Sequence, residues 1–329
     1  MAKKRILSGM RPTGKLHLGH YYGVIQNWLK LQKEYDCYFF VADWHALTTD
    51  YASPGAIKES TREMVLDWLA AGIDPNEAVL FRQSAVKEHA ELFVLLSMIT
   101  PLSWLERNPT YKEQLHEVSD KDLHTFGFLG YPVLQTADII IYKAEVVPVG
   151  IDQAPHLELS REITRRFNFL YGEVFPEPQT MLTEVPKILG TDGRKMSKSY
   201  NNAVFLSDSP KVIEQKLLSM VTDTARKRRT DPGSPDLCPF YLTYHVLFSD
   251  LQTKEWVRQG CAAAGIGCIE CKKSVVPRVL ADLEPIQARR AELEKDPEMV
   301  NAILGAGGAL ASAVAGVTMA EVRKAIRLE

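Results

Sequence analysis

The sequence has no excess of positive charge and no long apolar run. Lys and Arg number 39 against 41 Asp and Glu, so no global positive field indicates a nucleic-acid partner, and any such contact must depend on local patches. No run approaches the roughly 18 apolar residues that span a bilayer, and the charged N-terminus leads into no signal-peptide core. We therefore expect a cytoplasmic protein without a membrane partner.

Cysteine is scarce, and the GxGxxG dinucleotide fingerprint and internal repeats are absent. The missing fingerprint argues against a nicotinamide or flavin enzyme. Four of the five cysteines, Cys238, Cys261, Cys268 and Cys271, fall within 34 consecutive residues, and in a reducing compartment such a cluster indicates a metal site rather than disulfides. The fifth, Cys37, lies in an apolar run and is expected in the core.

Apolar runs at residues 5–8, 37–42, 78–83 and 146–149 are typical of buried strands, and helical patterns over residues 19–34 and 54–71 separate the first three. Strands that alternate with helices predict an α/β fold with a doubly wound parallel sheet. A chain of 329 residues has room for a second, smaller domain.

The remaining patterns divide the chain into parts. We predict a catalytic domain over residues 1–204, with a helical segment at about 88–144 and a mobile loop at 176–193. An all-helical domain should follow over residues 205–310. Residues 311–329 should pack back as a terminal helix, because residues 319–328 keep an amphipathic spacing.

The first loop-to-helix junction carries His17-Leu18-Gly19-His20. A helix N-terminus presents unpaired N–H groups and partial positive charge, which suits a triphosphate. The histidines are three positions apart and share a helical face, so both can donate to a phosphate. Gly19 leaves room for a flat base against the backbone.

About 175 residues later the chain reads Lys195-Met196-Ser197-Lys198-Ser199, on a glycine-flanked loop. Together the two motifs resemble the paired signatures of class I aminoacyl-tRNA synthetases. In such enzymes a carboxylate displaces pyrophosphate from ATP, and the protein supplies positioning and cations for the developing charge. We expect His17, His20, Lys195 and Lys198 to be catalytic, with Mg²⁺ bound mainly through the phosphates.

Four further blocks, residues 8–14, 43–48, 131–139 and 147–153, resemble the bacterial tryptophanyl-tRNA synthetase family, and the likeness covers nearly the whole chain. It implies a Rossmann-like catalytic domain that joins L-tryptophan to tRNA(Trp) through an adenylate. The implied ATP-binding residues are Arg11, Gly19, His20, Asp152, Lys195, Met196, Ser197 and Lys198. The implied tryptophan-binding residues are Leu7, His45, Tyr131, Gln135, Asp138 and Gln153.

Asp138 also stands out without the resemblance. It lies among Val133, Ala137 and Ile139 on a predicted helix, where a buried carboxylate needs a partner. Indole has one N–H donor, and an acceptor left unpaired costs about 1–3 kcal/mol, so phenylalanine should be rejected.

Three alternatives remain at this level. A tyrosyl-tRNA synthetase shares the fold and both signatures, although bacterial members usually carry an extra RNA-binding domain. Small adenylyltransferases share His-x-Gly-His but lack the lysine loop and are about half as long. An inactive relative that binds nucleic acid or serves redox chemistry would also retain the cysteine cluster.

The spacing Cys-x22-Cys-x6-Cys-x2-Cys fits either a tetrahedral zinc site or an iron–sulfur cluster. The resemblance favours a 4Fe-4S cluster in the tRNA-binding domain, since some bacterial members carry one with this pattern. It also implies a homodimer, with an interface in residues 88–144. The basic residues predicted to contact the tRNA are Arg226, Lys227, Arg228, Arg229, Lys272 and Lys273.

Overall fold

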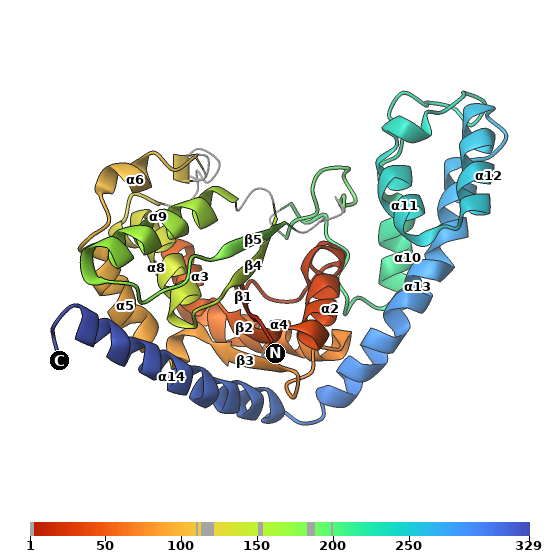
Figure 1. Cartoon of the computed structure of the whole chain (residues 1–329). Coiled ribbons are helices and arrows are strands. Elements are labelled where there is room, and N and C mark those ends of the chain that lie inside the picture. The colour runs from red at the N-terminus through yellow and green to blue at the C-terminus, as the bar shows by residue number, and fades with distance from the viewer. Residues whose placement is uncertain (1–2, 110, 113–121, 151–153, 183–187, 199) are drawn as a thin grey trace.

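The computed structural model describes residues 3–109, 111–112, 122–150, 154–182, 188–198 and 200–329. At its centre is a parallel five-stranded sheet in the order β3-β2-β1-β4-β5 (Figure 1). The strands are β1 (Arg5–Met10), β2 (Asp36–Val41), β3 (Ala78–Arg82), β4 (Val146–Val149) and β5 (Gln179–Leu182). The predicted parallel α/β sheet is confirmed.

Strand β5 corrects the prediction of a loop over residues 176–193. It pairs with β4 from Gln179 opposite Val146 to Leu182 opposite Val149. None of its four residues is buried, because it lies at the edge of the sheet. The strand therefore lacks the apolar run by which the others were recognised.

The first β-α unit begins with β1 and a loop in which Gly14 adopts a φ of 92°, a conformation that L side chains rarely adopt. The helix then starts as α1 (Leu18–His20), continues through a π-helical turn (Tyr21–Ile25) and ends as α2 (Gln26–Glu34). The predicted helix over residues 19–34 is present. Its π-turn is of a kind that often marks functional sites.

Helices cover both faces of the sheet, as expected of a doubly wound fold. One core contains Trp28 and Trp68 from α2 and α4, and the other contains Ile140 and Phe167 from α8 and α9. The helices of this part are α3 (Asp43–Asp50), α4 (Ile57–Ala71), α5 (Glu88–Ser97), α6 (Leu102–Glu106), α8 (Phe126–Ile141) and α9 (Ala154–Tyr171).

The second part is helical, as predicted, and stands apart from the sheet on the right of Figure 1. Its helices are α10 (Pro210–Ser219), α11 (Val246–Phe248), α12 (Leu251–Ala262) and α13 (Cys268–Leu293). The C-terminal end of α13 packs on α4 of the sheet domain, where Arg289 Nε donates to the Ala70 carbonyl at 2.6 Å. One long helix therefore reaches from the cysteine-rich segment to the catalytic domain.

The terminal helix α14 (Met299–Ala325) is longer than residues 311–329 suggested, and it packs along β3 (Figure 1). Gly307 allows this approach, since a side chain there would collide with the Leu80 carbonyl. By length and composition alone α14 could cross a membrane, although no such run was predicted from the sequence. Here it covers the sheet domain, and Arg323 pairs with Glu91 of α5 at 2.6 Å.

Candidate active site

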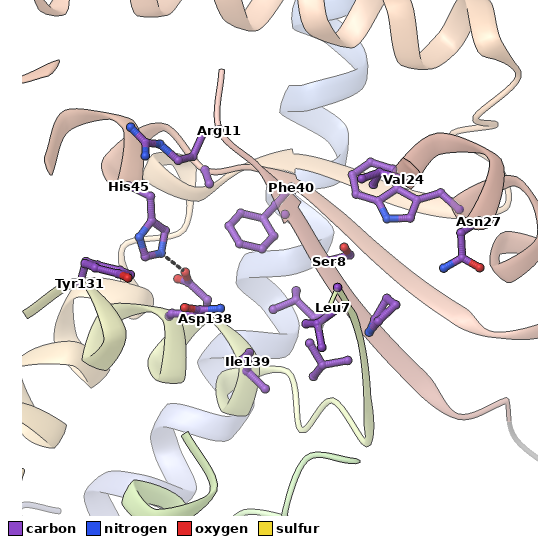
Figure 2. A pocket seen from close by; sticks show the side chains of 18 of the residues that line it. Leu7, Ser8, Arg11, Val24, Asn27, Phe40, His45, Tyr131, Asp138 and Ile139 are labelled. Atoms are coloured by element: carbon purple, nitrogen blue, oxygen red, sulfur yellow. Dashed lines mark hydrogen bonds and ion pairs between the residues drawn. The ribbon is translucent and has the colours of Figure 1, made fainter. Parts of the chain in front are cut away.

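A cavity of about 390 Å³ opens at the carboxyl ends of β1 and β4 (Figure 2). The strand order reverses between these two neighbours, and open parallel sheets bind ligands at such switch points. Gly9, near the end of β1, packs against the ring of Phe40, and any larger residue at this position would collide with that ring. The fold therefore supplies the space in which a substrate would lie.

The cavity brings together most of the residues predicted for tryptophan. Arg11, which was predicted for ATP, lines the same cavity and extends toward His45 and Tyr131 (Figure 2). Its Nη2 donates to the Thr49 hydroxyl and lies 3.7 Å from the Asp50 carboxylate. The predicted tryptophan residues that line the cavity are Leu7, His45, Tyr131, Gln135 and Asp138.

Asp138 is fully buried on α8, and donors surround its carboxylate. His45 Nε2 contacts Oδ2 at 2.9 Å (Figure 2), and Gln83 Nε2 lies 2.8 and 2.9 Å from the two oxygens. His89 Nδ1 contacts Oδ1, and its Nε2 lies 2.6 Å from the Tyr142 hydroxyl. Burial raises the pKa of Asp138, but His89 and His45 outweigh it and lower the pKa to about 2. The carboxylate is therefore ionised and held in one orientation.

Gln83, His89 and Tyr142 were not identified from the sequence. Gln83 is fully buried, and its Oε1 accepts the backbone N–H groups of Trp44 and His45 at 3.1 and 3.3 Å. It thus connects the start of α3 to Asp138. Two signals for these residues were available in the sequence. Gln83 ends a predicted strand, and His89 lies in an apolar helical pattern.

Tyr131 reaches His156 on α9, with 2.6 Å between the hydroxyl and Nε2. His156 also contacts the Asn108 amide at 3.1 Å, through Nδ1. Burial raises the pKa of Tyr131, so its hydroxyl is protonated and available to donate. Asp152 and Gln153, predicted for ATP and tryptophan, lie outside the described residues.

The two histidines of the first signature stack on each other, with 3.7 Å between ring centroids. Gly19 is constrained by this pair, since a Cβ there would lie 2.9 Å from His17 Cε1. Burial, assisted by the charge of Lys198, lowers the pKa of His17 to about 4. Burial also lowers the pKa of His20, with His17 and Lys198 adding to the effect. Both rings are therefore neutral near pH 7.

Lys198, of the second signature, lies beside the first. Its ammonium donates to the Thr13 carbonyl at 2.7 Å and to the Thr13 hydroxyl at 3.1 Å. Burial lowers the pKa of Lys198 to about 8. Lys195 is exposed, whereas Met196 is buried and Ser197 N–H donates to Asn202 at 2.8 Å. Ser199 lies outside the described residues.

The four clustered cysteines converge in the helical part, although no described group of three or more His, Cys, Asp or Glu is arranged to hold a metal ion. Burial raises the pKa of Cys271 to about 12, and the other three thiols add to the effect. Arg226 Nη1 lies 3.8 Å from the sulfur of Cys261 and 3.9 Å from that of Cys268. His245 Nε2 lies 3.1 Å from the Cys271 sulfur. The four thiols are thus near enough to influence one another electrostatically, but they are not arranged as a metal site.

The basic residues predicted for tRNA divide into two groups. Lys227, Arg228, Arg229 and Lys273 are exposed, whereas Arg226 is half-buried. Lys272 is only 4% exposed and donates to the Leu218 carbonyl at 2.8 Å, so its prediction as an RNA contact is wrong for this structure. Its four-carbon stem is long enough to reach the buried end of α10.

A parallel sheet whose first loop-helix junction carries His-x-Gly-His, with a lysine loop folded against it, defines the class I aminoacyl-tRNA synthetases. The chain belongs to the family of class I tRNA synthetases for tryptophan and tyrosine, whose sequence model matches residues 2–279. Within that family it is a tryptophan–tRNA ligase, as three comparisons show.

Over 327 residues the chain is 56% identical to the tryptophan–tRNA ligase of Thermotoga maritima, covering 98% of this chain and 99% of that protein. It is 48% identical to the enzyme of Aquifex aeolicus, covering 98% and 100%. Among solved structures, tryptophanyl-tRNA synthetase from Campylobacter jejuni, complexed with ADP and tryptophan, superposes with a TM-score of 0.86 at 32% identity, covering 98% and 99%. Because these matches cover nearly the whole chain, they exclude the small adenylyltransferase alternative, which would account for only about half of it.

Proposed function

We propose that the chain activates L-tryptophan with ATP in the cavity between β1 and β4 and then transfers it to the 3′ end of tRNA(Trp). One observation carries the proposal. The ionised Asp138 lines the cavity on one side of the sheet's switch point, while His17, His20 and Lys198 gather at the first helix N-terminus. An acceptor for indole and a cationic phosphate site are thus built into one fold.

In the first step the tryptophan carboxylate attacks the α-phosphorus of ATP and pyrophosphate leaves. Lys195 and Lys198 stabilise charge on the departing phosphates, and the neutral His17 and His20 donate hydrogen bonds to them. Mg²⁺ brought in with the ATP phosphates would neutralise part of the same charge. The other residues proposed for ATP are Arg11, Gly19, Asp152, Met196 and Ser197.

Tryptophan is recognised in the cavity itself. Asp138 accepts the indole N–H, and Leu7 and His45 bound the ring. Tyr131, Gln135 and Gln153 hold the amino and carboxyl groups of the substrate. Gln83 and His89 already donate to Asp138 Oδ1. The other oxygen, Oδ2, is contacted by His45, which lines the cavity, so the indole N–H is proposed to bind on that side.

The purified chain should exchange labelled pyrophosphate into ATP with tryptophan but not with tyrosine or phenylalanine. The reason is that neither competitor has an N–H at the position that Asp138 serves. Equal exchange with tyrosine would contradict the proposal. Loss of exchange with every amino acid would instead indicate an inactive relative.

Cys238, Cys261, Cys268 and Cys271 are proposed to hold one metal centre, and the likeness to cluster-bearing synthetases favours 4Fe-4S over zinc. The convergence of the four thiols supports it, since both kinds of centre require sulfur ligands from nearby positions. The centre would supply no step of adenylate chemistry. It would stiffen the surface that contacts RNA.

Anaerobically prepared protein should be brown and contain about four iron atoms per chain. A Cys268→Ser variant should lose the iron and charge tRNA less well, yet retain pyrophosphate exchange. Cys37→Ser is the matched control, because Cys37 is buried in β2, far from the cluster in the sequence. A colourless protein with one zinc would exclude the iron–sulfur centre, and full charging by the metal-free variant would exclude its role.

The helical part is proposed to bind the tRNA anticodon through Lys227, Arg228, Arg229 and Lys273. These side chains are exposed, and phosphates are contacted by such cations while unstacked bases provide specificity. Arg229 donates to the Ala264 and Gly265 carbonyls at 2.5 and 2.8 Å, which fixes the loop. Arg226, which faces the thiols, would contribute to this surface only indirectly.

The chain is further proposed to be a cytoplasmic homodimer whose interface involves α5, α6 and α8. Val94, Met98, Leu102 and Phe126 expose large apolar side chains there, and Met98 is 73% exposed. The ring of Phe126 lies 6.4 Å from that of Phe93 on α5, so the helices present one apolar surface. Surfaces of this kind often mark contacts between subunits.

Light scattering should report twice the 37.0 kDa mass of the chain at micromolar concentration. Met98→Glu should shift the protein toward monomer, because a carboxylate would be buried at the interface. Phe169→Glu, at a residue 88% exposed on α9, is the control and should remain dimeric. A wild-type monomer would contradict the proposal.

A further inference from the structure

A fully buried carboxylate lies directly behind the first signature. Asp67 is on α4, at 0% exposure, and its Oδ2 accepts the backbone N–H of Leu16 at 2.6 Å. Leu16 immediately precedes His17 in the chain. This hydrogen bond therefore holds the backbone at the point from which both signature histidines project.

The charge of Asp67 is balanced from the other end of the sequence. Arg290, on α13 and 5% exposed, donates through Nη1 to Asp67 Oδ1. Its remaining nitrogens reach Glu63 Oε2 at 2.6 Å and Glu294 Oε1 at 2.9 Å. Burial raises the pKa of Asp67, and Arg290 opposes that effect. A charge this far from water needs such a partner.

Asp67 also acts on the second signature. Burial lowers the pKa of Lys198, and the negative charge of Asp67 opposes it. Backbone hydrogen bonds also join the first signature to the chain that follows the second. Leu18 N–H donates to the Val204 carbonyl at 3.0 Å, and Leu206 N–H donates to that of Leu16 at 2.9 Å. The loop thus lies between α4 and the chain that follows the lysine loop.

We propose that Asp67, with Arg290 as its counter-ion, is a positioning residue for ATP activation. Asp67 fixes the Leu16 backbone and so places His17 and His20. This inference rests on the proposed role of these two histidines at the triphosphate. A simple ion pair that joined α4 to α13 would need Asp67 and Arg290 but not the hydrogen bond from Leu16.

Two double variants separate these roles. Asp67→Asn/Arg290→Met removes both charges but leaves an amide oxygen for Leu16. Asp67→Leu/Arg290→Met removes both charges and the acceptor. Neither leaves an unpaired charge at the two substituted positions, so comparison between them isolates the Leu16 hydrogen bond. Should the leucine variant not fold, Asp67→Ser/Arg290→Met tests the same point, because a serine side chain is too short to reach Leu16.

Tryptophan-dependent pyrophosphate exchange, melting temperature and direct ATP binding are measured for each protein. The leucine variant should lose about 10- to 100-fold in kcat/KM for ATP relative to the asparagine variant, because small displacements of catalytic groups are costly. The KM for tryptophan should change less than about twofold, since Asp67 does not line the tryptophan cavity.

Equal ATP kinetics and equal ATP affinity in the two variants would overturn the inference and leave Asp67 a structural ion pair. A parallel rise in the KM values for ATP and tryptophan would overturn it as well. Failure of the wild-type chain to exchange with tryptophan would instead contradict the proposed function. The direct ATP-binding comparison would still decide the role of Asp67 in that case.

Discussion

Replacing Lys198 with alanine is expected to lower the kcat of tryptophan-dependent pyrophosphate exchange by about 100- to 1,000-fold, the usual effect of removing one preorganised donor from a developing negative charge. The KM for tryptophan should be nearly unchanged, because the partner of Lys198 is charge that forms in the transition state. Lys195→Ala should act in the same direction. The assay is steady-state exchange with each substrate varied in turn.

The control for this prediction is Lys211→Ala, which removes an exposed lysine from α10, outside both signatures. It should behave as wild type. A Lys198→Ala enzyme changed only in its KM for tryptophan would contradict the proposed role.

The depressed pKa of Lys198 adds a pH signature to the same experiment. Because its pKa is about 8, the ammonium is charged below that pH and loses its proton above it. The value of kcat/KM for ATP, which reports groups of the free enzyme, should therefore fall as the pH rises through about 8. In Lys198→Arg that alkaline limb should move to higher pH, because arginine remains charged.

The sequence was sufficient for the elements whose patterns are strong. Strand β4 was predicted at the residues where it is found, and the buried acid at Asp138 followed from its apolar neighbours. The two signatures were recognised as a pair, and the structure brings Lys198 to His17. Both successes depend on local periodicity or on rare residue combinations, which a single sequence displays directly.

Other features depend on tertiary contacts that no local pattern displays. The many Gly and Ala residues of α14 give a weak amphipathic pattern, so the sequence predicted too short a helix. These small residues are explained by the fold, because Gly307 packs directly against the backbone of β3. The stem of Lys272 turns into the protein, although its sequence neighbourhood is that of a basic surface. Arg226 likewise faces sulfur rather than solvent.

Asp67 could have been found by the reasoning that identified Asp138, because it lies between Leu66 and Trp68 in an apolar run of α4. Its partner could not, since Arg290 is more than 200 residues away and its helix carries charges on several faces. The same holds for Gln83 and His89 around Asp138. A buried acid can therefore be predicted from one sequence, whereas the donors that hold it come from the fold.

Asp138→Asn is expected to lower kcat/KM for tryptophan by about 100-fold or more, while the protein still folds. The side chain keeps its shape, but one acceptor becomes a donor. If its N–H₂ faced Gln83 or His89, buried donors would oppose each other, and if it faced the cavity, the indole N–H would lose its acceptor. Asp138→Ala is less informative, because it would leave two buried donors, Gln83 and His89, without their acceptor at about 1–3 kcal/mol each.

The matched control for Asp138→Asn is Asp43→Asn, because Asp43 is also a buried carboxylate with several donors but does not line the cavity. Both variants should melt at lower temperature than wild type, since each loses charge-assisted hydrogen bonds. Only Asp138→Asn should reduce the preference for tryptophan over tyrosine, measured as the ratio of their kcat/KM values in pyrophosphate exchange. A ratio that stayed at the wild-type level would remove Asp138 from indole recognition and assign it, with His89 and Gln83, to the stability of the core.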